Sequence, residues 1–559
     1  MPPHPHRYLL PIAAFLAILP MLLYGPSPGH DFNFHLLSWL EAARQYAHGL
    51  YPHWAYTPAY NAGEPRFVFY PPISWTLGAL LTTLLPHHWP AVPIVFIFIA
   101  LTLAGFTAYH LCRDFAPAPI ATLAATLYVV NPYMLFTAYE RSAFAELLAA
   151  AFLPLLFRAA LAPRPRIVPL AISIALLWLT NAPAAVMGCY ALAFLTLVRL
   201  ILPSTPRKLH LALTTTAGTA LGLLLAAFYI LPAAYERRFV HIDMALVEGL
   251  RITDHFLFHR MPGGTPDDLF HDAVVRTASY IAVALLLTIA TALALSRKRP
   301  LPLILLAAAI ALLLTPLSLP LWNHIPQLAF LQFPWRLNAL LAVIATIALT
   351  QTLKRLTIPY SRAGSPPSGL CSVGWLLPTP CLILTMALVG PAWHAFHQPN
   401  SLEGPTNTRI AHMQLPQGND PTDEYTPTVA DNDALHPGNP PFWTSCTDNP
   451  AEPPPANSIP APLPNHLALT VPCPGILILN RRDFPAWHIT LNGYPATPLP
   501  AERDDGLIAL AVPAGPAILN LTYTQTPDRT LGELLSALAA LTLATLAVRR
   551  IDYTHQVEP

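Results

Sequence analysis

Long apolar runs alternate with short polar segments over most of the chain. Most runs approach the roughly 20 residues that an α-helix needs to cross the hydrocarbon core of a bilayer. The runs cover residues 8–24, 72–86, 92–111, 117–136, 143–161, 166–180, 183–202, 210–232, 274–295, 300–320, 335–353, 371–391 and 531–549. This pattern predicts a mainly α-helical, polytopic membrane protein with about twelve transmembrane helices.

Basic clusters between the runs predict the sidedness, because arginine and lysine are enriched in cytoplasmic loops. The clusters are Arg158/Arg164/Arg166, Arg207/Lys208, Arg297/Lys298/Arg299, Lys354/Arg355/Arg362 and Arg549/Arg550. With these clusters inside, both termini are cytoplasmic. The loops at 25–71 and 233–273 and the long segment at 392–530 are then extracytoplasmic.

Thirteen full spans cannot join two termini on the same side, so one run does not cross the membrane. The best candidate is 72–86, which begins with two prolines and fits a short or re-entrant helix. A single interrupted span over 166–202, broken at Asn181-Ala182-Pro183, is the alternative.

The segment at 392–530 separates a membrane domain at 1–391 from a last helix and cytoplasmic tail at 531–559. Its first part is rich in proline, and strand-like runs follow from about residue 465. The runs are 466–471, 475–479, 487–491, 507–512 and 517–523, with a strong hairpin signal at Asn492-Gly493. A small β-sandwich is expected, either binding glycan or capping the membrane domain. Cys446 and Cys473 can form a disulfide there if the segment is extracytoplasmic.

Composition supports the membrane class and excludes several functions. The chain has 559 residues, of which 54% are hydrophobic and 11% charged, and its net charge is +1. That charge offers no basic excess to meet nucleic-acid phosphates. No phosphate-binding loop or dinucleotide fingerprint occurs in the sequence, which argues against an ATP-driven pump. Arginine greatly outnumbers lysine, as is typical of a GC-rich bacterial genome.

The first external loop combines an amphipathic helix with carboxylates. Helical spacing from residue 31 to 48 puts Phe32, Leu36, Leu40, Ala43 and Ala47 on one face and Asp31, His35, Ser38, Gln45 and His48 on the other. Such a helix is expected to lie flat on the membrane with its polar face in water. A polar loop with carboxylates at a lipid boundary is a suitable place for membrane-enzyme chemistry.

Several short motifs spread along the chain carry a family resemblance. They are Asp31 with His35, Gly49-Leu-Tyr-Pro-His-Trp54, Gly63-Glu-Pro-Arg-Phe67, Tyr70-Pro71-Pro72, Asn131-Pro132-Tyr133, Glu140-Arg141 with Glu146, Gln332-Phe-Pro-Trp-Arg336, Glu424-Tyr425 with Pro427, and Phe484-Pro-Ala-Trp487 before Asn492-Gly493. Together they resemble a bacterial membrane protein family labelled 6-pyruvoyl-tetrahydropterin synthase-related. The architecture is also similar to GT-C glycosyltransferases, which use lipid-phosphate sugars and place an acidic residue in the first external loop.

This resemblance implies a glycosyltransferase of the bacterial inner membrane. It would move a sugar from a polyprenyl-phosphate donor, held among membrane lipids, to an extracytoplasmic glycan or envelope acceptor. The phosphate already leaves well, so no strong acid is required. The acceptor hydroxyl needs a base or a divalent metal ion, and the released phosphate needs positive charge.

Asp31 is the candidate base or metal anchor, and His35, one helical turn later, could orient it. The structural alternatives are that Asp31 only caps the surface helix and that His35 is an interfacial polar residue.

Five further residues are candidates for substrate binding. Glu64 lies in a turn, as a second carboxylate or as a solvated acid. Glu140 and Arg141 lie at the external mouth of a helix. Glu146 is deeper, where a charge is costly and needs a partner, and Arg141 is the nearest one in sequence. Arg336 begins another span and could clamp a lipid phosphate, beside a tryptophan explained by the aromatic belt.

The sequence leaves two alternative functions to consider. Pterin chemistry would need a zinc site of three or more converging ligands. Gly29-His-Asp-Phe-Asn33 echoes such a motif only superficially, since His30 and His35 fall on different helix faces. The second alternative is a non-catalytic protein, either a lipid or glycan transporter or an envelope-assembly scaffold. The scarcity of midspan charges argues against a polar transport path.

Overall fold

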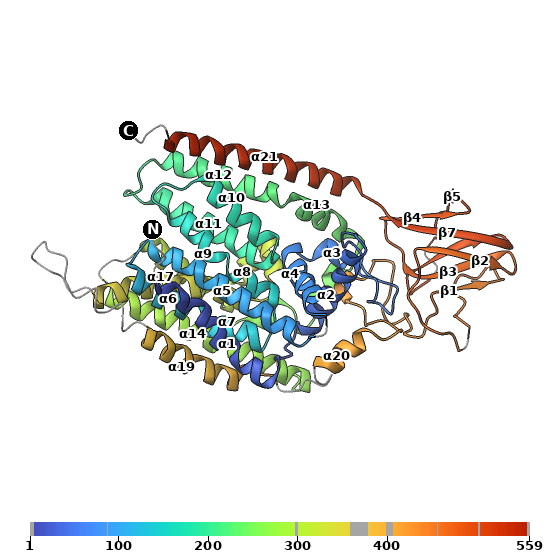
Figure 1. Cartoon of the computed structure of the whole chain (residues 1–559), viewed down its shortest axis with the longest axis horizontal. Helices are drawn as coiled ribbons and strands as arrows, with labels where there is room; N and C mark the ends of the chain where they lie inside the picture. The colour runs from blue at the N-terminus through green and yellow to red at the C-terminus, as the bar shows by residue number, and fades with distance from the viewer. Residues whose placement is uncertain are drawn as a thin grey trace, which may run out of the picture.

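The computed structural model describes residues 5–86, 88–296, 300–357, 378–398, 406–455, 457–500 and 503–555. The expected basic anchors at 297–299 and Arg362, and the first part of the run at 371–391, lie outside these residues. Figure 1 shows a bundle of helices with a smaller domain of strands at one end. This is the mainly α-helical protein with a small β domain that the sequence predicted.

Helices make up most of the described chain. They are α1 (Leu9–Tyr24), α2 (Phe32–Ala47), α3 (Arg66–Phe69), α4 (Pro72–Leu84), α5 (Ala91–Arg113), α6 (Ala118–Val129), α7 (Pro132–Tyr139), α8 (Phe144–Ala150), α9 (Leu153–Leu161), α10 (Ile167–Trp178), α11 (Ala182–Ile201), α12 (Lys208–Leu225), α13 (Ala227–Glu236), α14 (Pro266–Leu295), α15 (Leu301–Leu313), α16 (Leu319–His324), α17 (Asn338–Thr357), α19 (Pro378–Phe396), α20 (Thr406–Met413) and α21 (Pro527–His555). Short 3₁₀ turns connect several of them, including η4 (Ile252–His255), η7 (Pro334–Leu337) and η8 (Asp423–Tyr425).

Nine helical stretches in the described residues are long and apolar enough to cross a membrane, and two bent pairs raise the number to eleven. The bent pairs are α12 with α13, at 73°, and α15 with α16, at 95°. The expected count of about twelve also included the run at 166–180, which forms the short helix α10. The run at 72–86 forms the short helix α4, as its prolines predicted. The start of α1 and the end of α21 both lie at the end of the bundle away from the strands (Figure 1).

Seven strands form two sheets after residue 440. They are β1 (Phe442–Ser445), β2 (His466–Val471), β3 (Gly475–Arg482), β4 (Trp487–Leu491), β5 (Tyr494–Pro495), β6 (Leu507–Val512) and β7 (Gly515–Tyr523). The sheet orders are β1-β3-β6 and β2-β7-β4-β5, with antiparallel neighbours throughout. All five predicted strands are present, whereas β1 and the two-residue strand β5 were not predicted.

A hairpin turn and a disulfide in the β domain also agree with the expectations from the sequence. Asn492 and Gly493 have φ angles of 53° and 83° and join β4 to β5. Positive φ at both central residues is what a tight two-residue hairpin turn requires, and Asn-Gly tolerates it. Cys446 and Cys473 are joined by a disulfide, with Cα atoms 5.6 Å apart, as expected.

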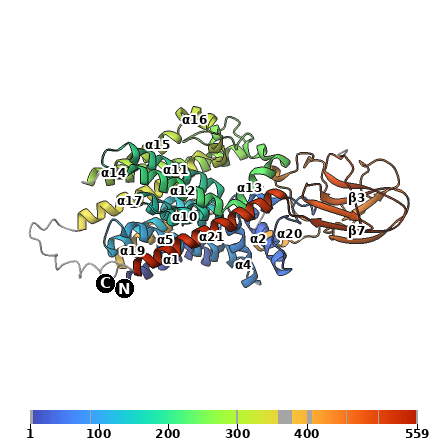
Figure 2. The same cartoon turned by 90° about the horizontal axis from the view of Figure 1, so that it is seen from above.

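The prediction for α2 was wrong about its polar face. His35, Ser38 and Gln45 were expected in water, but all three are buried. The helix packs against α4 and is covered by the rest of the first loop and by α20 (Figures 1 and 2). Tertiary partners far along the chain therefore cover the face that local periodicity assigned to solvent.

Candidate functional site

The chain just before α2 crosses the break between α7 and α8, and this crossing builds the site. Ser142 Oγ donates to Ser27 O at 2.7 Å and accepts from Gly29 N at 3.0 Å. Asp31 N donates to Arg141 O at 2.9 Å. These bonds hold two segments of irregular backbone together, because neither is satisfied within a helix. Asp31 and Arg141 are neighbours as a result.

A glycine is required at the crossing. A Cβ atom built on Gly29 would lie 2.2 Å from the carbonyl oxygen of Glu140, well inside van der Waals contact. Ser142 adds strain on the other segment, since its φ of 50° lies in the left-handed region that non-glycine residues rarely adopt. Strained backbone of this kind is concentrated at functional sites.

Asp31 occupies the N-cap position of α2, but its side chain makes no capping hydrogen bond. Its carboxylate instead lies 3.5 Å from Arg141 Nη2, and its side chain is 40% exposed. The expectation that Asp31 merely caps the helix therefore does not describe its side chain. A carboxylate that is partly exposed and only loosely paired can meet a ligand.

Arg141 is buried and binds two carboxylates. Its Nη1 donates to Glu146 Oε2 at 2.6 Å, and its guanidinium lies 4.7 Å from the centre of the Trp335 ring. Burial alone would lower the pKa of Arg141, but the carboxylates of Glu146 and Asp31 raise it above its ordinary value. Arg141 is therefore a permanently charged group, and the predicted pairing with Glu146 is present.

Glu146 extends this contact to a second arginine. Arg336 Nε lies 3.4 Å from Glu146 Oε2, and the Tyr133 hydroxyl donates to Glu146 Oε1. Arg336 Nη1 is held by Leu331 O at 2.8 Å and by the Gln332 side chain. The charged network consists of Asp31, Arg141, Glu146 and Arg336. It joins the start of α2, the α7–α8 break and the start of α17.

Glu140 lies beside the charged network without joining it. It is only 6% exposed, and its carboxyl makes no hydrogen bond or ion pair with any described residue. Burial raises the pKa of Glu140 to about 8, although the Arg141 charge opposes that shift. The crossing thus holds a carboxyl group that carries a proton over much of the neutral pH range.

His35 does not orient the Asp31 carboxylate in this structure. Its ring is buried among aromatic rings, including Trp39 and Phe144, and its Nδ1 has no hydrogen-bond partner among the described residues. Burial lowers the pKa of His35 to about 4, so the ring is neutral at physiological pH. Only its backbone N–H reaches Asp31, as the donor of a helical bond to Asp31 O at 3.1 Å.

Glu64 is not the solvated turn acid that the sequence suggested as one alternative. It is 1% exposed, and its Oε1 lies 2.7 Å from Arg66 Nε. The backbone N–H of Thr422 donates to its other oxygen at 3.0 Å. A turn flanked by glycine and proline looked solvent-exposed, but a segment 358 residues later covers it.

Sequence reasoning missed two contributors to the site and misjudged a third. No sequence pattern marked Gly29 or Ser142 as part of the site. Trp335 was expected in the aromatic belt, but it is 2% exposed and lies under Arg141. Its Nε1 donates to His255 Nδ1 at 3.3 Å, so the segment between α13 and α14 supports it.

No group of three or more potential metal ligands occurs among the described residues. A divalent metal ion at Asp31 would have to share that carboxylate with Arg141. The described residues around Asp31 therefore do not form the ligand set of a metal site.

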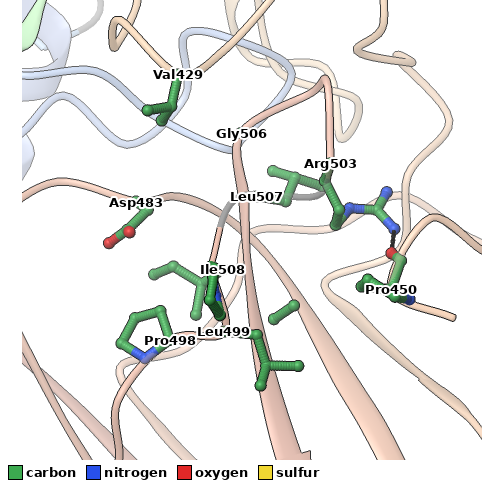
Figure 3. A pocket seen from close by; sticks show the side chains of 11 residues that line it. Val429, Pro450, Asp483, Pro498, Leu499, Arg503, Gly506, Leu507 and Ile508 are labelled. Atoms are coloured by element: carbon green, nitrogen blue, oxygen red, sulfur yellow. Dashed lines mark hydrogen bonds between the residues drawn. The ribbon is translucent and has the colours of Figure 1, made fainter. Parts of the chain in front are cut away.

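A separate pocket lies in the β domain, where Asp483, Arg503 and Ile508 contribute to its lining (Figure 3). Its arginine is already occupied, because Arg503 pairs with Asp505 and donates to Pro450 O. The pocket thus presents no free cation from that arginine to an anionic ligand.

These features define a polytopic membrane protein with a charged site where its first loop meets the helical bundle. Residues 67–390 match the family described as 6-pyruvoyl-tetrahydropterin synthase related domain, membrane protein. The match covers more than half of the chain, and the chain belongs to this family. No curated protein matches its sequence.

Solved structures of two kinds of enzyme are similar in part. Arabinofuranosyltransferase AftD from Mycobacteria is 17% identical, with a TM-score of 0.42 over 71% of this chain and 27% of that chain. The Archaeoglobus fulgidus oligosaccharyltransferase in complex with Zn and sulfate is 17% identical, with a TM-score of 0.39 over 71% and 54%. The same organism's AglB, in complex with an inhibitory peptide and a dolichol-phosphate, has 17% identity and a TM-score of 0.37 over 72% and 56%. The chain spans about a quarter of AftD and about half of the archaeal enzyme.

Proposed function

We propose that this membrane protein is a glycosyltransferase that moves a sugar from a polyprenyl-phosphate carrier to a hydroxyl acceptor. The observation that carries the proposal is the Asp31–Arg141 pair. It combines a part-exposed carboxylate with a buried guanidinium held by Glu146, where the first loop meets the apolar helices. Both residues belong to the motifs that resemble the 6-pyruvoyl-tetrahydropterin synthase-related family.

Each group has a role in this reaction. Asp31 accepts the proton of the acceptor hydroxyl while the hydroxyl oxygen attacks the anomeric carbon of the sugar. The bond from that carbon to the phosphate oxygen then breaks. The leaving phosphate keeps the bonding electron pair. Arg141 and Arg336 stabilise the charge it carries, as fixed donors do where charge develops. Glu146 holds both arginines in place, and no step requires a strong acid.

The proposed sidedness follows from the position of the site. Figure 1 shows α2 and the strands at the same end of the bundle, opposite the start of α1 and the end of α21. The basic clusters in the sequence favour cytoplasmic termini. We therefore place the site and the β domain on the extracytoplasmic face, where a glycan or envelope acceptor would be met.

Replacing Asp31 by asparagine in the purified protein tests the proposal. Native mass spectrometry first establishes whether wild-type protein binds a synthetic polyprenyl-phosphate sugar, and transfer is then measured with that donor. We expect Asp31→Asn to lower kcat by about 10²–10⁴-fold, the range for loss of a general base. Asp114→Asn, in an exposed pair with Arg158, is the matched control and should keep full activity.

Two results would contradict the proposal. Unchanged transfer by Asp31→Asn would remove Asp31 as the base. Binding of the carrier without any transfer by wild-type protein would instead favour a transporter or scaffold.

A further inference from the structure

Arg66 is a buried arginine that the proposed reaction does not use. All three guanidinium nitrogens have partners: Nε pairs with Glu64, Nη2 donates to Thr422 Oγ1 at 2.8 Å, and Nη1 donates to Ser38 Oγ at 3.2 Å and, more weakly, to Phe34 O at 3.4 Å. The guanidinium also lies 4.4 Å from the centre of the Phe34 ring. One side chain therefore connects the first loop, α2 and the segment that follows α20.

The segment from Thr406 to Thr426, here called the tail segment, contacts the beginning of α2 in two places. Thr422 reaches it through Arg66, as described above. In addition, Arg409 Nη1 of α20 donates to Asn33 Oδ1 at 2.8 Å. Asn33 is the second residue of α2, and Asp31 directly precedes that helix. The tail segment thus holds the helical turn that presents Asp31.

The loop between α2 and Arg66 is strained, and later parts of the chain hold it. Ala59, Tyr60 and Asn61 have consecutive φ angles of 52°, 50° and 70°. Three adjacent non-glycine residues in this region persist only where their surroundings dictate the backbone. Tyr60 N donates to Asn419 O at 2.8 Å, and Asn480 Nδ2 of β3 donates to Tyr60 O at 2.9 Å. The tail segment and the β domain therefore stabilise this loop conformation.

An aromatic anchor joins the same loop to the β domain. Trp54 is 1% exposed, and its ring packs against Phe484, Trp487 and Tyr523 with centroid distances of 5.7, 5.5 and 5.9 Å. Burial of a tryptophan among aromatic rings is strongly stabilising. The loop that carries the candidate base is therefore part of the core of the β domain.

We infer that the tail segment positions Asp31, with Thr422 and Arg66 as the residues that hold the first turn of α2 in line with Arg141. Arg66 is a positioning residue, since it contacts no reacting atom. The β domain and tail segment thereby serve the site as a clamp. The effect on catalysis rests on the proposed function, whereas the effect on α2 does not.

Replacing Thr422 by valine tests the clamp with the smallest change in shape. It removes the hydroxyl that accepts from Arg66 and leaves the Glu64–Arg66 pair. Hydrogen–deuterium exchange of residues 32–40 is measured without substrate, so its result does not depend on activity. We expect exchange to rise at least about tenfold, the factor that loss of a hydrogen bond to a charged group predicts. Thr422→Ser should restore wild-type exchange.

Thr524→Val is the matched control, because the Thr524 hydroxyl donates within the β domain, to Ala486 O at 2.9 Å. Exchange at residues 32–40 that stays at the wild-type level in Thr422→Val, or that rises equally in Thr524→Val, would overturn the clamp. In an active wild-type protein, Thr422→Val should also lower kcat several-fold at unchanged donor KM. Raised exchange with full kcat would overturn the positioning role. An inactive wild-type protein would overturn only the proposed function.

Discussion

Two carboxylate–arginine pairs in this protein use the same chemistry in different surroundings. Glu236, at the end of α13, and Arg529, in the first turn of α21, form a bidentate pair with distances of 3.0 and 3.2 Å. Both side chains are nearly inaccessible, at 2% and 5% exposure. In contrast, Asp31 is 40% exposed and lies 3.5 Å from Arg141. The Glu236 pair is closed and structural, whereas the Asp31 pair can open to a ligand.

The difference lies in how each arginine is paired. Arg529 donates to both oxygens of one carboxylate and to the Tyr523 hydroxyl at 2.8 Å. Arg141 is anchored by Glu146 and points its second amino group towards Asp31. An anionic ligand could compete for that loosely held group without exposing Glu146. A close pair between oppositely charged residues is therefore not in itself a sign of function, and its accessibility matters more.

Among the changes that compare the two pairs, the largest effect on activity is expected from Arg141→Lys. A lysine ammonium is a point charge without the planar fork that reaches Asp31 and Glu146 together. Loss of one fixed donor at a developing charge lowers rates by about 10²–10³-fold, and we expect a fall of that size in kcat. Sugar transfer from a polyprenyl-phosphate donor measures it. Arg158→Lys, in the exposed pair with Asp114, should retain activity. A fully active Arg141→Lys would remove the distinction between the open and the closed pair.

A smaller effect on activity but a large one on stability is expected from Glu236→Gln. The change leaves the Arg529 charge buried without its partner, and breaking a buried pair typically costs about 3–5 kcal/mol. The Tm in detergent should therefore fall clearly, while kcat per folded molecule stays unchanged. Asp114→Asn breaks an exposed pair and should change Tm little. A loss of kcat in folded Glu236→Gln would show that this pair also serves the reaction.

Glu140→Gln is also expected to act on stability rather than on activity, and its effect is measured as a change in the pH dependence of Tm. The folded protein holds the Glu140 proton up to about pH 8, whereas the unfolded chain loses it near 4.5. Stability from this group is therefore present below about pH 4.5 and is lost as the pH rises to about 8. Glu140→Gln should reduce the fall in Tm between pH 5 and 8.5. An identical pH profile in both proteins would contradict the buried, protonated state.

Local patterns in the sequence predicted the parts of the fold that local physics determines. Apolar runs gave the helical spans, and alternating runs with an Asn-Gly turn gave the strands. The contact between Glu146 and Arg141 was also predictable, because a charge within an apolar helix needs a partner and only one was near in sequence.

Long-range contacts set the rest of the site, and no local pattern encodes them. Asp31 meets Arg141 across 110 residues, and Glu64 is covered by a segment 358 residues away. Helical periodicity placed His35 and Ser38 on the solvent-exposed face, because it cannot show that Phe144 packs against His35 and that Arg66 bonds to Ser38. The position of β1 was hidden for the same reason, since its pairing with β3 rather than its composition defines it.

The crossing of the first loop with the α7–α8 break has a consequence for biogenesis. Gly29 leaves the ribosome 113 residues before Ser142, which at about 5–20 residues per second is roughly 6–23 s earlier. Thr422 follows Arg66 by 356 residues, or roughly 18–71 s. During that interval the charged groups of the first loop have no native partners, and the contacts that hold its positive φ angles at Ala59, Tyr60 and Asn61 do not yet exist. Quality-control factors at the translocon would therefore meet this loop before the rest of the protein exists to shelter it.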